Sequence, residues 1–294
     1  MSEKRLSIIL FLALVIIWGS AFILIKRSLV AFDSLQVASI RMISALIVLF
    51  PFAIKKIRQV KKKEWPFIAI SGLVGSLIPA ILFAEGMNHS ITSGTAGILS
   101  ALTPSFTFII SVTFFGLKFN IKQPIGLVIG FLGAFLLLIS KSEVGFQFNS
   151  YGWLIVLATS LYAINLTLVK YKLKEADPLS ISAFSLIFTL PVTIWILLTS
   201  DFITVLKEHP EAYSSLGYSF LLGASATGIA LHLFNKLLKI ANPVFISSVT
   251  YAIPLVALFW GFLDGEEISW TMLFACLIII FSIYLIRQNG HSKA

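Results

Sequence analysis

Arg41 is the charged residue that stands deepest inside an apolar run of this 294-residue chain. A guanidinium placed in hydrocarbon is costly, so it either extends to the interface or faces a polar partner. In the second case its forked donors would bind an anionic group or a carbonyl of a solute. Glu85 ends the following apolar run. It is a candidate partner for Arg41, a candidate carrier of a coupling proton, or a solvated loop residue.

Two further polar residues lie about one helical turn apart in a later apolar run. His232 is either a packing residue with satisfied hydrogen bonds or a proton relay. Asn235 either joins neighbouring helices through hydrogen bonds or forms part of a gate. Both residues are therefore candidates for a transport pathway.

Aromatic residues occupy matching places in two of the apolar runs. Trp18 and Phe22 share one face of the first run, while Tyr162 and Asn165 share one face of a run that begins near residue 151. Such aromatics either line a pathway for amphipathic solutes or pack against the core and the lipid. Because Asn165 is polar and the pattern is repeated, we weigh the two interpretations, a solute pathway and packing, equally.

Two prolines interrupt apolar runs, and each leaves a backbone carbonyl without its helical partner. Pro104 releases the carbonyl of Ser100, and Pro254 releases that of Thr250. In hydrocarbon a released carbonyl needs a partner, which is either a nearby Ser or Thr hydroxyl or a cavity. We interpret the two prolines as matching hinges beside a central cavity. Tyr251, next to Thr250, is added to the residues expected to line it.

Short catalytic motifs are absent from the sequence. It has no Gly-Lys pair and hence no phosphate-binding loop, no His-Glu-x-x-His, no Gly-x-Ser-x-Gly, and no carboxylate cluster within the apolar runs. Cys276 is the single cysteine, which excludes an internal disulfide and a cysteine-based metal cluster. We therefore predict that the protein is not an enzyme and uses no cofactor or metal.

Composition places the chain in a membrane. It is 58% hydrophobic and 12% charged, and its mean hydropathy is +0.97. A soluble domain of this size could not cover itself with so few charges. The net charge of +9 is explained by basic loops beside anionic lipid headgroups, so we expect a lipid bilayer and no nucleic acid as partner.

The apolar runs predict an all-α integral membrane protein with ten transmembrane helices. The first run follows Lys4 and Arg5 like a signal peptide, but it continues to Ile25 and is long enough to be an uncleaved span. Gly126, Gly130 and Gly133 predict close packing of the fifth span against another helix. The spans are expected near residues 6–28, 35–54, 66–86, 94–116, 123–140, 151–170, 179–199, 216–236, 243–263 and 269–286.

Basic residues predict the orientation of these spans. With the N-terminus in the cytoplasm, seventeen of the 22 Lys and Arg residues fall on the cytoplasmic side and four on the far side, with Arg41 inside a span. This bias is typical of membrane proteins in their native orientation. Both termini are therefore expected in the cytoplasm, and a bacterial chain would lie in the inner (cytoplasmic) membrane.

The chain also repeats itself weakly. Two motifs recur at an offset of 144 positions: Trp18-Gly19 with Tyr162-Ala163, and Asp33-Ser34-Leu35 with Asp177-Pro178-Leu179. Thr103-Pro104 pairs with Ile253-Pro254 at an offset of 150. Because five spans are an odd number, the second half would enter the membrane inverted. We predict two inverted five-helix repeats, residues 1–144 and 145–294, with a substrate site between them.

Several segments resemble one transporter family. Trp18-Gly19-Ser20-Ala21-Phe22 is similar to the opening motif of EamA-type members of the drug/metabolite transporter superfamily, and Arg41 stands where that family often has an arginine. Residues 227–236 and 242–267 also resemble the family, and the similarity covers essentially the whole chain. Gly116-Leu117-Lys118 departs from the Gly-Glu pair that the family often has there.

The resemblance implies alternating access around a cavity lined by the first, third, fourth, sixth, eighth and ninth helices. It implies a permease that exports small metabolites, amino acids among them; we expect neutral, zwitterionic or amphipathic solutes. The alternatives are a transporter of phosphorylated or nucleotide-linked sugars, which would need several basic residues in the cavity, and a non-transporting scaffold or receptor. A homodimer is left open. The predicted cavity residues are Trp18, Phe22, Arg41, Ser100, Pro104, Tyr162, Asn165, His232, Asn235, Thr250, Tyr251 and Pro254.

Overall fold

In a computed structural model, the described residues are 3–89, 91, 93–141, 150–253, 255–256 and 269–287, and these ranges hold helices and no strand. Within them, six helical stretches are long and apolar enough to cross a membrane: Arg5–Ser28, Ser34–Gln59, Lys62–Asn88, Gly152–Lys172, Pro178–Thr199 and Ala212–Ile240. Four shorter apolar helices are Thr103–Phe115, Lys122–Leu136, Pro243–Ile253 and Trp270–Ile286. The all-helical prediction is confirmed, while the number of crossings and the inverted arrangement stay predictions.

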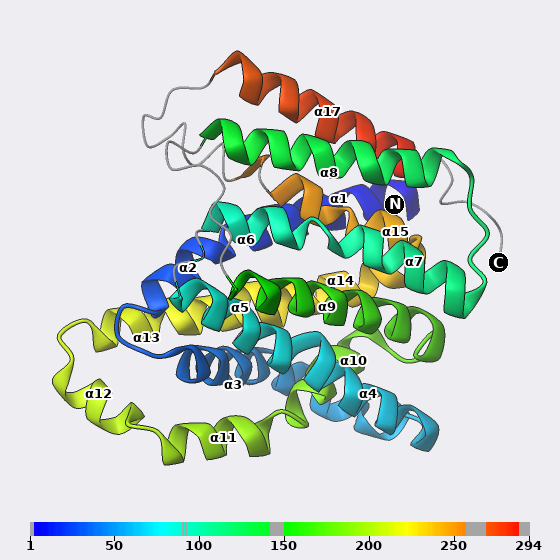
Figure 1. Cartoon of the computed structure of the whole chain (residues 1–294). Coiled ribbons are helices and arrows are strands. Elements are labelled where there is room, and N and C mark those ends of the chain that lie inside the picture. The colour runs from blue at the N-terminus through cyan, green and yellow to red at the C-terminus, as the bar shows by residue number, and fades with distance from the viewer. Residues whose placement is uncertain are drawn as a thin grey trace.

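The helices of the first half form the blue to green part of the bundle (Figure 1). They are α1 (Glu3–Gly19), α2 (Ala21–Ser28), α3 (Ser34–Ala53), α4 (Trp65–Gly72), α5 (Ile78–Asn88), α6 (Ser93–Ser100), α7 (Thr103–Phe115) and α8 (Lys122–Lys141), with short turns η1 (Ile54–Gln59) and η2 (Lys62–Glu64) between α3 and α4.

The helices of the second half complete the bundle. They are α9 (Gly152–Lys172), α10 (Pro178–Ile187), α11 (Leu190–Thr199), α12 (Phe202–Glu208), α13 (Ala212–Leu221), α14 (Ala230–Ile240), α15 (Pro243–Ser247) and α17 (Trp270–Arg287).

Two aspartates that match at the offset of 144 begin equivalent helices. The side chain of Asp33 accepts a hydrogen bond from the Gln36 backbone N–H at 2.7 Å and caps α3. The side chain of Asp177 accepts one from the Ser180 backbone N–H at 2.9 Å and caps α10. Each satisfies a donor that the first turn of a helix leaves free.

Two helices contain a π-helical segment in their middle. These segments are η3 (Leu73–Leu77), between α4 and α5, and η4 (Leu222–Ile229), between α13 and α14. Glycines let both approach their neighbours closely: a Cβ atom on Gly75 would overlap the side-chain amide of Asn165, and one on Gly223 would overlap the backbone carbonyl of Arg41. Such π segments are rare and occur often at functional sites.

Helices α8 and α17 lie side by side at one edge of the bundle, the top of Figure 1. The glycine seam of α8 forms this contact, since Cβ atoms on Gly126 and Gly133 would meet Ile286 and Ile278. The predicted close packing of the fifth span is therefore confirmed. The opposite face of α17 is apolar and exposed, with Trp270 and Leu277 on it.

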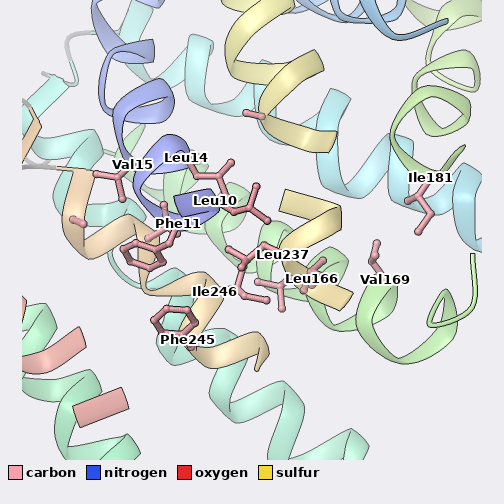
Figure 2. Close-up of a cluster of buried hydrophobic side chains, with 14 of the residues drawn as sticks. Leu10, Phe11, Leu14, Val15, Leu166, Val169, Ile181, Leu237, Phe245 and Ile246 are labelled. Carbon is pink, nitrogen blue, oxygen red and sulfur yellow. The ribbon is translucent and has the colours of Figure 1, made fainter. Parts of the chain in front are cut away.

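A cluster of buried hydrophobic side chains lies where α1, α9, α14 and α15 meet (Figure 2). Leu10 and Leu14 of α1 point toward Leu237 of α14 in this view. The rings of Phe11 and Phe245 stack with their centroids 5.1 Å apart. Apolar burial of this kind joins the first helix of the chain to helices of the second half.

Candidate functional site

A cavity of about 150 Å³ lies in the middle of the bundle. Both halves of the chain line it, through α1, α2, α3, η3, α5, α6 and α7 from the first and α9, η4, α14 and α15 from the second. Seven of the twelve residues predicted for the site line this cavity: Trp18, Phe22, Arg41, Ser100, Tyr162, Asn165 and Thr250.

Arg41 enters the cavity from α3. Its Nε donates a hydrogen bond to Thr227 Oγ1 at 2.5 Å, and its guanidinium interacts with the hydroxyl of Tyr162. Thr227 belongs to the π segment η4, which Gly223 brings against α3. Among the described residues, these local contacts favour the cavity-facing interpretation of Arg41 over extension into the interface.

Asn165 lies on α9 one turn after Tyr162 and also faces the cavity. Its side chain sits against Gly75 of η3 and the residue is 4% exposed. Its Oδ1 atom has no hydrogen-bond partner among the described residues. Because an unpaired buried carbonyl costs about 1–3 kcal/mol, this atom is suited to accept a hydrogen bond from a bound solute.

Aromatic rings form the apolar wall of the cavity. Trp18 Nε1 donates to the Ala226 carbonyl of η4 at 2.9 Å, which fixes the indole. Its ring centroid lies 5.4 Å from that of Phe234, and the rings of Phe83 and Tyr162 are 6.0 Å apart. These faces suit a flat or apolar solute body.

Four hydroxyl groups of the cavity come from two interrupted helices. Ser100 and Thr103 flank the break between α6 and α7, and each donates to the carbonyl three residues earlier, at 2.8 and 2.7 Å. Ser247 and Thr250 flank the end of α15 and do the same at 2.9 and 3.0 Å. Their protons are used locally, so these hydroxyls present lone pairs to the cavity.

This arrangement changes the interpretation of the prolines. Pro104 lies in the first turn of α7, where its missing N–H costs little, and the released Ser100 carbonyl accepts from Thr103. The break in the second half falls at Ser248, before the predicted hinge. Thus the two breaks correspond through their Ser-x-x-Thr pairs, Ser100/Thr103 and Ser247/Thr250, at an offset of 147. The two prolines, at an offset of 150, are not at equivalent distances from the breaks. Pro254 lies outside the described residues.

Three other predicted residues lie away from the cavity. Tyr251 is fully buried toward α8, where its hydroxyl donates to the Leu127 carbonyl at 2.9 Å. Asn235 Nδ2 donates to Ser182 Oγ at 2.9 Å and joins α14 to α10. His232 does not line the cavity.

Glu85 does not pair with Arg41. Its carboxylate accepts a hydrogen bond from Ser34 Oγ and lies 3.3 Å from His89 Nδ1. The His89 ring stacks on Tyr151 with centroids 4.0 Å apart. This polar cluster lies where α5 ends and where α3 and α9 begin, and we call this end of the bundle the glutamate end.

The cavity is closed toward the opposite end by packed apolar side chains. Leu166 of α9 and Ile246 of α15 line the cavity and also belong to the core cluster of Figure 2. The stacked rings of Phe11 and Phe245 pack α1 against α15 in the same cluster. These residues form the floor of the cavity.

Beyond the floor, two lysines tie α9 to α14, and we call this end the lysine end. Lys170 Nζ donates to the carbonyls of Leu238 and Ala241 at 2.6 and 2.8 Å. Lys239 Nζ donates to the carbonyls of Leu173 and Lys174 at 2.7 and 2.6 Å. Each ammonium thus binds carbonyls at or just beyond the C-terminus of the other helix, where positive charge is favourable.

Two ion pairs at the lysine end tie the segment between α3 and α4 to the residues directly before α10. Lys56 Nζ lies 2.8 Å from Asp177 Oδ1, and Lys61 Nζ lies 2.5 Å from Glu175 Oε2. The first pair is partly shielded, and its aspartate also caps α10. The second pair is exposed and is expected to contribute little.

Several cavity residues were not predicted. Thr227, Phe83, Phe234 and Ser247 line the cavity, together with Gly75. Thr227 belongs to a run of small residues, Gly-Ala-Ser-Ala-Thr-Gly, that could have been recognised as a close-packing segment. Nothing in the apolar pattern distinguishes Phe83 or Phe234 from aromatics that face lipid.

The sequence matches one family model twice. The EamA-like transporter family matches residues 5–139 and again residues 150–288. The "Uncharacterized inner membrane transporter YedA" of Escherichia coli (strain K12) is 25% identical over 290 residues, covering 95% of this chain and 90% of that protein.

Two relatives are named for the solutes that they carry. The "S-adenosylmethionine/S-adenosylhomocysteine transporter" of Chlamydia muridarum is 26% identical, covering 93% of this chain and 89% of that protein. The "Probable terminal-alkyne amino-acid exporter" of Streptantibioticus cattleyicolor is 23% identical, covering 60% of this chain and 61% of that protein. A crystal structure with 15% sequence identity has a TM-score of 0.75 and covers 98% of both chains, which shows the shared fold.

Proposed function

The chain belongs to the EamA-like transporter family, and from this membership we propose that it is a secondary transporter that moves small metabolites across the membrane by alternating access. As a family member it is a multi-pass membrane protein of a transporter class. The observation that carries the proposal is the central cavity, which is lined by helices of both halves and closed at the lysine end.

We also propose the two-repeat architecture, with residues 1–144 and 145–294 as inverted five-helix units. Three structural correspondences support it: the capping aspartates Asp33 and Asp177, the π segments η3 and η4, and the two Ser-x-x-Thr breaks. Repeats of this kind place the substrate site at their interface, near the middle of the bilayer.

The proposed orientation puts the lysine end in the cytoplasm. In that case the floor and the hydrogen bonds of Lys170 and Lys239 form a closed cytoplasmic gate. The cavity then lies on the outer side of this gate. Transport then requires a second packing in which these contacts separate, and the two packings must differ by a few kcal/mol. Export, the direction that we propose, would load the substrate when this gate is open.

The substrate class that we propose is small, neutral, zwitterionic or amphipathic. A cavity of about 150 Å³ is smaller than typical sites for drug-sized ligands, which occupy about 300–1,000 Å³. Names of two relatives, an amino-acid exporter and an S-adenosylmethionine transporter, add amino acids and their derivatives to the candidates. Phosphorylated sugars are disfavoured because Arg41 is the single basic residue among the described cavity residues.

Paired cysteines on one helix test whether the cavity is the pathway. In a Cys276→Ser background, Leu231→Cys places a thiol in the cavity, and Ile229→Cys places one on the outer face, where Ile229 is 45% exposed. In proteoliposomes, a water-soluble thiol reagent should label the first variant and block solute exchange. The second should stay active. Equal inhibition of both variants would refute the cavity as pathway.

Single cysteines at exposed positions outside the expected spans test the orientation. Lys62→Cys and Lys172→Cys should react only with reagents that reach the cytoplasm, and Glu208→Cys should react from outside. Labelling of Lys62→Cys and Lys172→Cys from opposite sides would contradict the ten-span topology.

A further inference from the structure

The cavity contains one uncompensated positive charge. Among the described residues that line it, Arg41 is the single charged side chain. Thr227 and Tyr162 accept or share its hydrogen bonds but are neutral. Charge near the centre of a bilayer is costly unless an opposite charge approaches it, so the site as built favours a bound anion over a cation.

Among the described lining residues, the charged hydrogen-bond donors of the cavity belong to Arg41. Four of the cavity hydroxyls, those of Ser100, Thr103, Ser247 and Thr250, give their protons to their own helices. The guanidinium has five N–H donors, of which Nε–H is taken by Thr227. A planar carboxylate can therefore use the remaining fork in the bidentate geometry that arginine prefers.

Asn165 adds a second requirement. Its Oδ1 is buried and unpaired among the described residues, so it calls for an N–H or O–H donor on the solute. The Tyr162 hydroxyl reaches Arg41, and Asn165 follows Tyr162 by one turn on the same face. A donor on the carbon next to the carboxylate would therefore approach Asn165.

The charge of that donor decides between two ligand classes. The Asn165 amide is neutral, and a hydroxyl satisfies it without adding charge. An ammonium would bring a second cation beside Arg41, with no carboxylate among the described residues of the cavity to receive it. A monoanionic hydroxy acid leaves the loaded site neutral, whereas a zwitterion leaves the charge of Arg41 uncompensated overall.

We infer that the cavity selects monoanionic 2-hydroxy carboxylates with an apolar or aromatic body, holding the carboxylate on Arg41 and the hydroxyl on Asn165. Trp18, Phe22 and Phe234 would surround the body. The inference rests on the proposed function and narrows its substrate class to amphipathic anions, because the same cavity is taken as the transport site.

Four compounds with one phenyl body test this selection: 3-phenyllactate, phenylalanine, 3-phenylpropionate and 2-phenylethanol. Binding to the purified protein is measured by calorimetry. We expect 3-phenyllactate to bind tightest. Loss of its hydroxyl should weaken binding about tenfold, the equivalent of one hydrogen bond to a buried acceptor. Phenylalanine should bind at least about tenfold more weakly than 3-phenyllactate. The alcohol 2-phenylethanol should show no saturable binding.

Two variants assign the groups. Asn165→Leu should bind 3-phenyllactate and 3-phenylpropionate equally, and Arg41→Gln should weaken both. His232→Gln, away from the cavity, is the matched control and should keep the wild-type order. Thermal unfolding verifies that each variant is folded. Phenylalanine binding as tightly as 3-phenyllactate, or unchanged 3-phenyllactate binding by folded Arg41→Gln, would overturn the inference.

Exchange in proteoliposomes separates this inference from the proposed function. If 3-phenyllactate binds in the expected order but no solute is exchanged, the binding site is supported and the transport function fails. If another solute is exchanged while the expected order is absent, transport stands and the hydroxy-acid selection is refuted.

Discussion

Lys170 and Lys239 bind the ends of each other's helices. Lys170, near the end of α9, donates to carbonyls at and just after the end of α14. Lys239, near the end of α14, donates to two carbonyls just after the end of α9. The two contacts form one reciprocal clasp directly beyond the apolar floor of the cavity. Any movement that separates α9 from α14 at this end must break all four hydrogen bonds.

Removing the clasp should shift the protein toward the state that is open at the lysine end. Hydrogen bonds from charged donors contribute about 1.5–3 kcal/mol each, so Lys170→Ala with Lys239→Ala should change the equilibrium at least about tenfold. The measurement is the labelling rate of Ile246→Cys, in the floor, from the lysine side in a Cys276→Ser background. Lys172→Ala, an exposed position on α9, is the control. An unchanged labelling rate would mean that the clasp does not hold the gate.

The interrupted helices should respond alike to loss of their threonine hydroxyls. Thr103→Val leaves the Ser100 carbonyl without its side-chain donor, and Thr250→Val does the same to the Ser247 carbonyl. Each should lower the free energy of unfolding by about 1–3 kcal/mol, the cost of an unsatisfied buried group.

The matched control for both is Thr113→Val. Thr113 donates to the Ile109 carbonyl at 2.7 Å within an uninterrupted, exposed part of α7, so its loss should change stability by less than about 0.5 kcal/mol. Chemical denaturation in detergent compares the three variants. A loss in Thr113→Val as large as in the other two would show that the breaks are not special.

The sequence predicts several residues that line the cavity, but not how the backbone forms it. Trp18 and Tyr162 are predicted because aromatic residues recur at one offset. Asn165 is predicted because it is polar and shares a face with Tyr162, and Arg41 because charge in an apolar run is rare. The π segments could not be predicted, since the same apolar pattern fits an α-helix. Their effect is to bring Thr227 to Arg41 and Gly75 to Asn165.

Proline marks one of the two helix breaks that the structure describes. Pro104 follows the break between α6 and α7, whereas at the other break a threonine hydroxyl supplies the donor, from Thr250 to the Ser247 carbonyl. Pro254, the second predicted hinge, lies outside the described residues. Tyr251, predicted to line the cavity, follows the break at Ser248 and lies toward α8 instead. Carbonyl partners such as those of Lys170 carry no sequence signal at all.

Acid should loosen the lysine end through Asp177. Partial burial raises the pKa of Asp177, but hydrogen bonds from Lys56 and Ser180 outweigh it and lower the pKa below its ordinary value. A lowered folded pKa stabilises the protein above the unfolded value, about 3.9, and this stabilisation is lost as pH falls through the folded pKa. The free energy of unfolding of wild type should therefore fall between about pH 4 and the lower folded pKa, by no more than about 1 kcal/mol. The thermal midpoint, measured across this pH range, should fall with it.

Asp177→Asn removes that titration and should flatten this part of the pH profile. Glu175→Gln is the comparison, because Glu175 also pairs with a lysine at this end but is exposed. It should leave the profile nearly unchanged. A wild-type profile that Asp177→Asn does not alter would show that the Lys56 pair makes no contribution to stability.

Gly223→Ala should damage the site without touching the cavity directly. A Cβ at this position would overlap the backbone carbonyl of Arg41 and the Cβ of Ser44, so η4 must move away from α3. That displacement separates Thr227 from Arg41 and leaves the guanidinium with fewer partners. Overpacking of this kind costs about 1–3 kcal/mol, and solute exchange should fall at least about tenfold, since small displacements of site residues have large effects on rate.

Gly217→Ala, in the preceding turns of the same span with open space around it, should keep wild-type exchange and unfold at the same or a slightly higher temperature. Equal activity of the two alanine variants in proteoliposomes would show that close contact between η4 and α3 does not position Arg41.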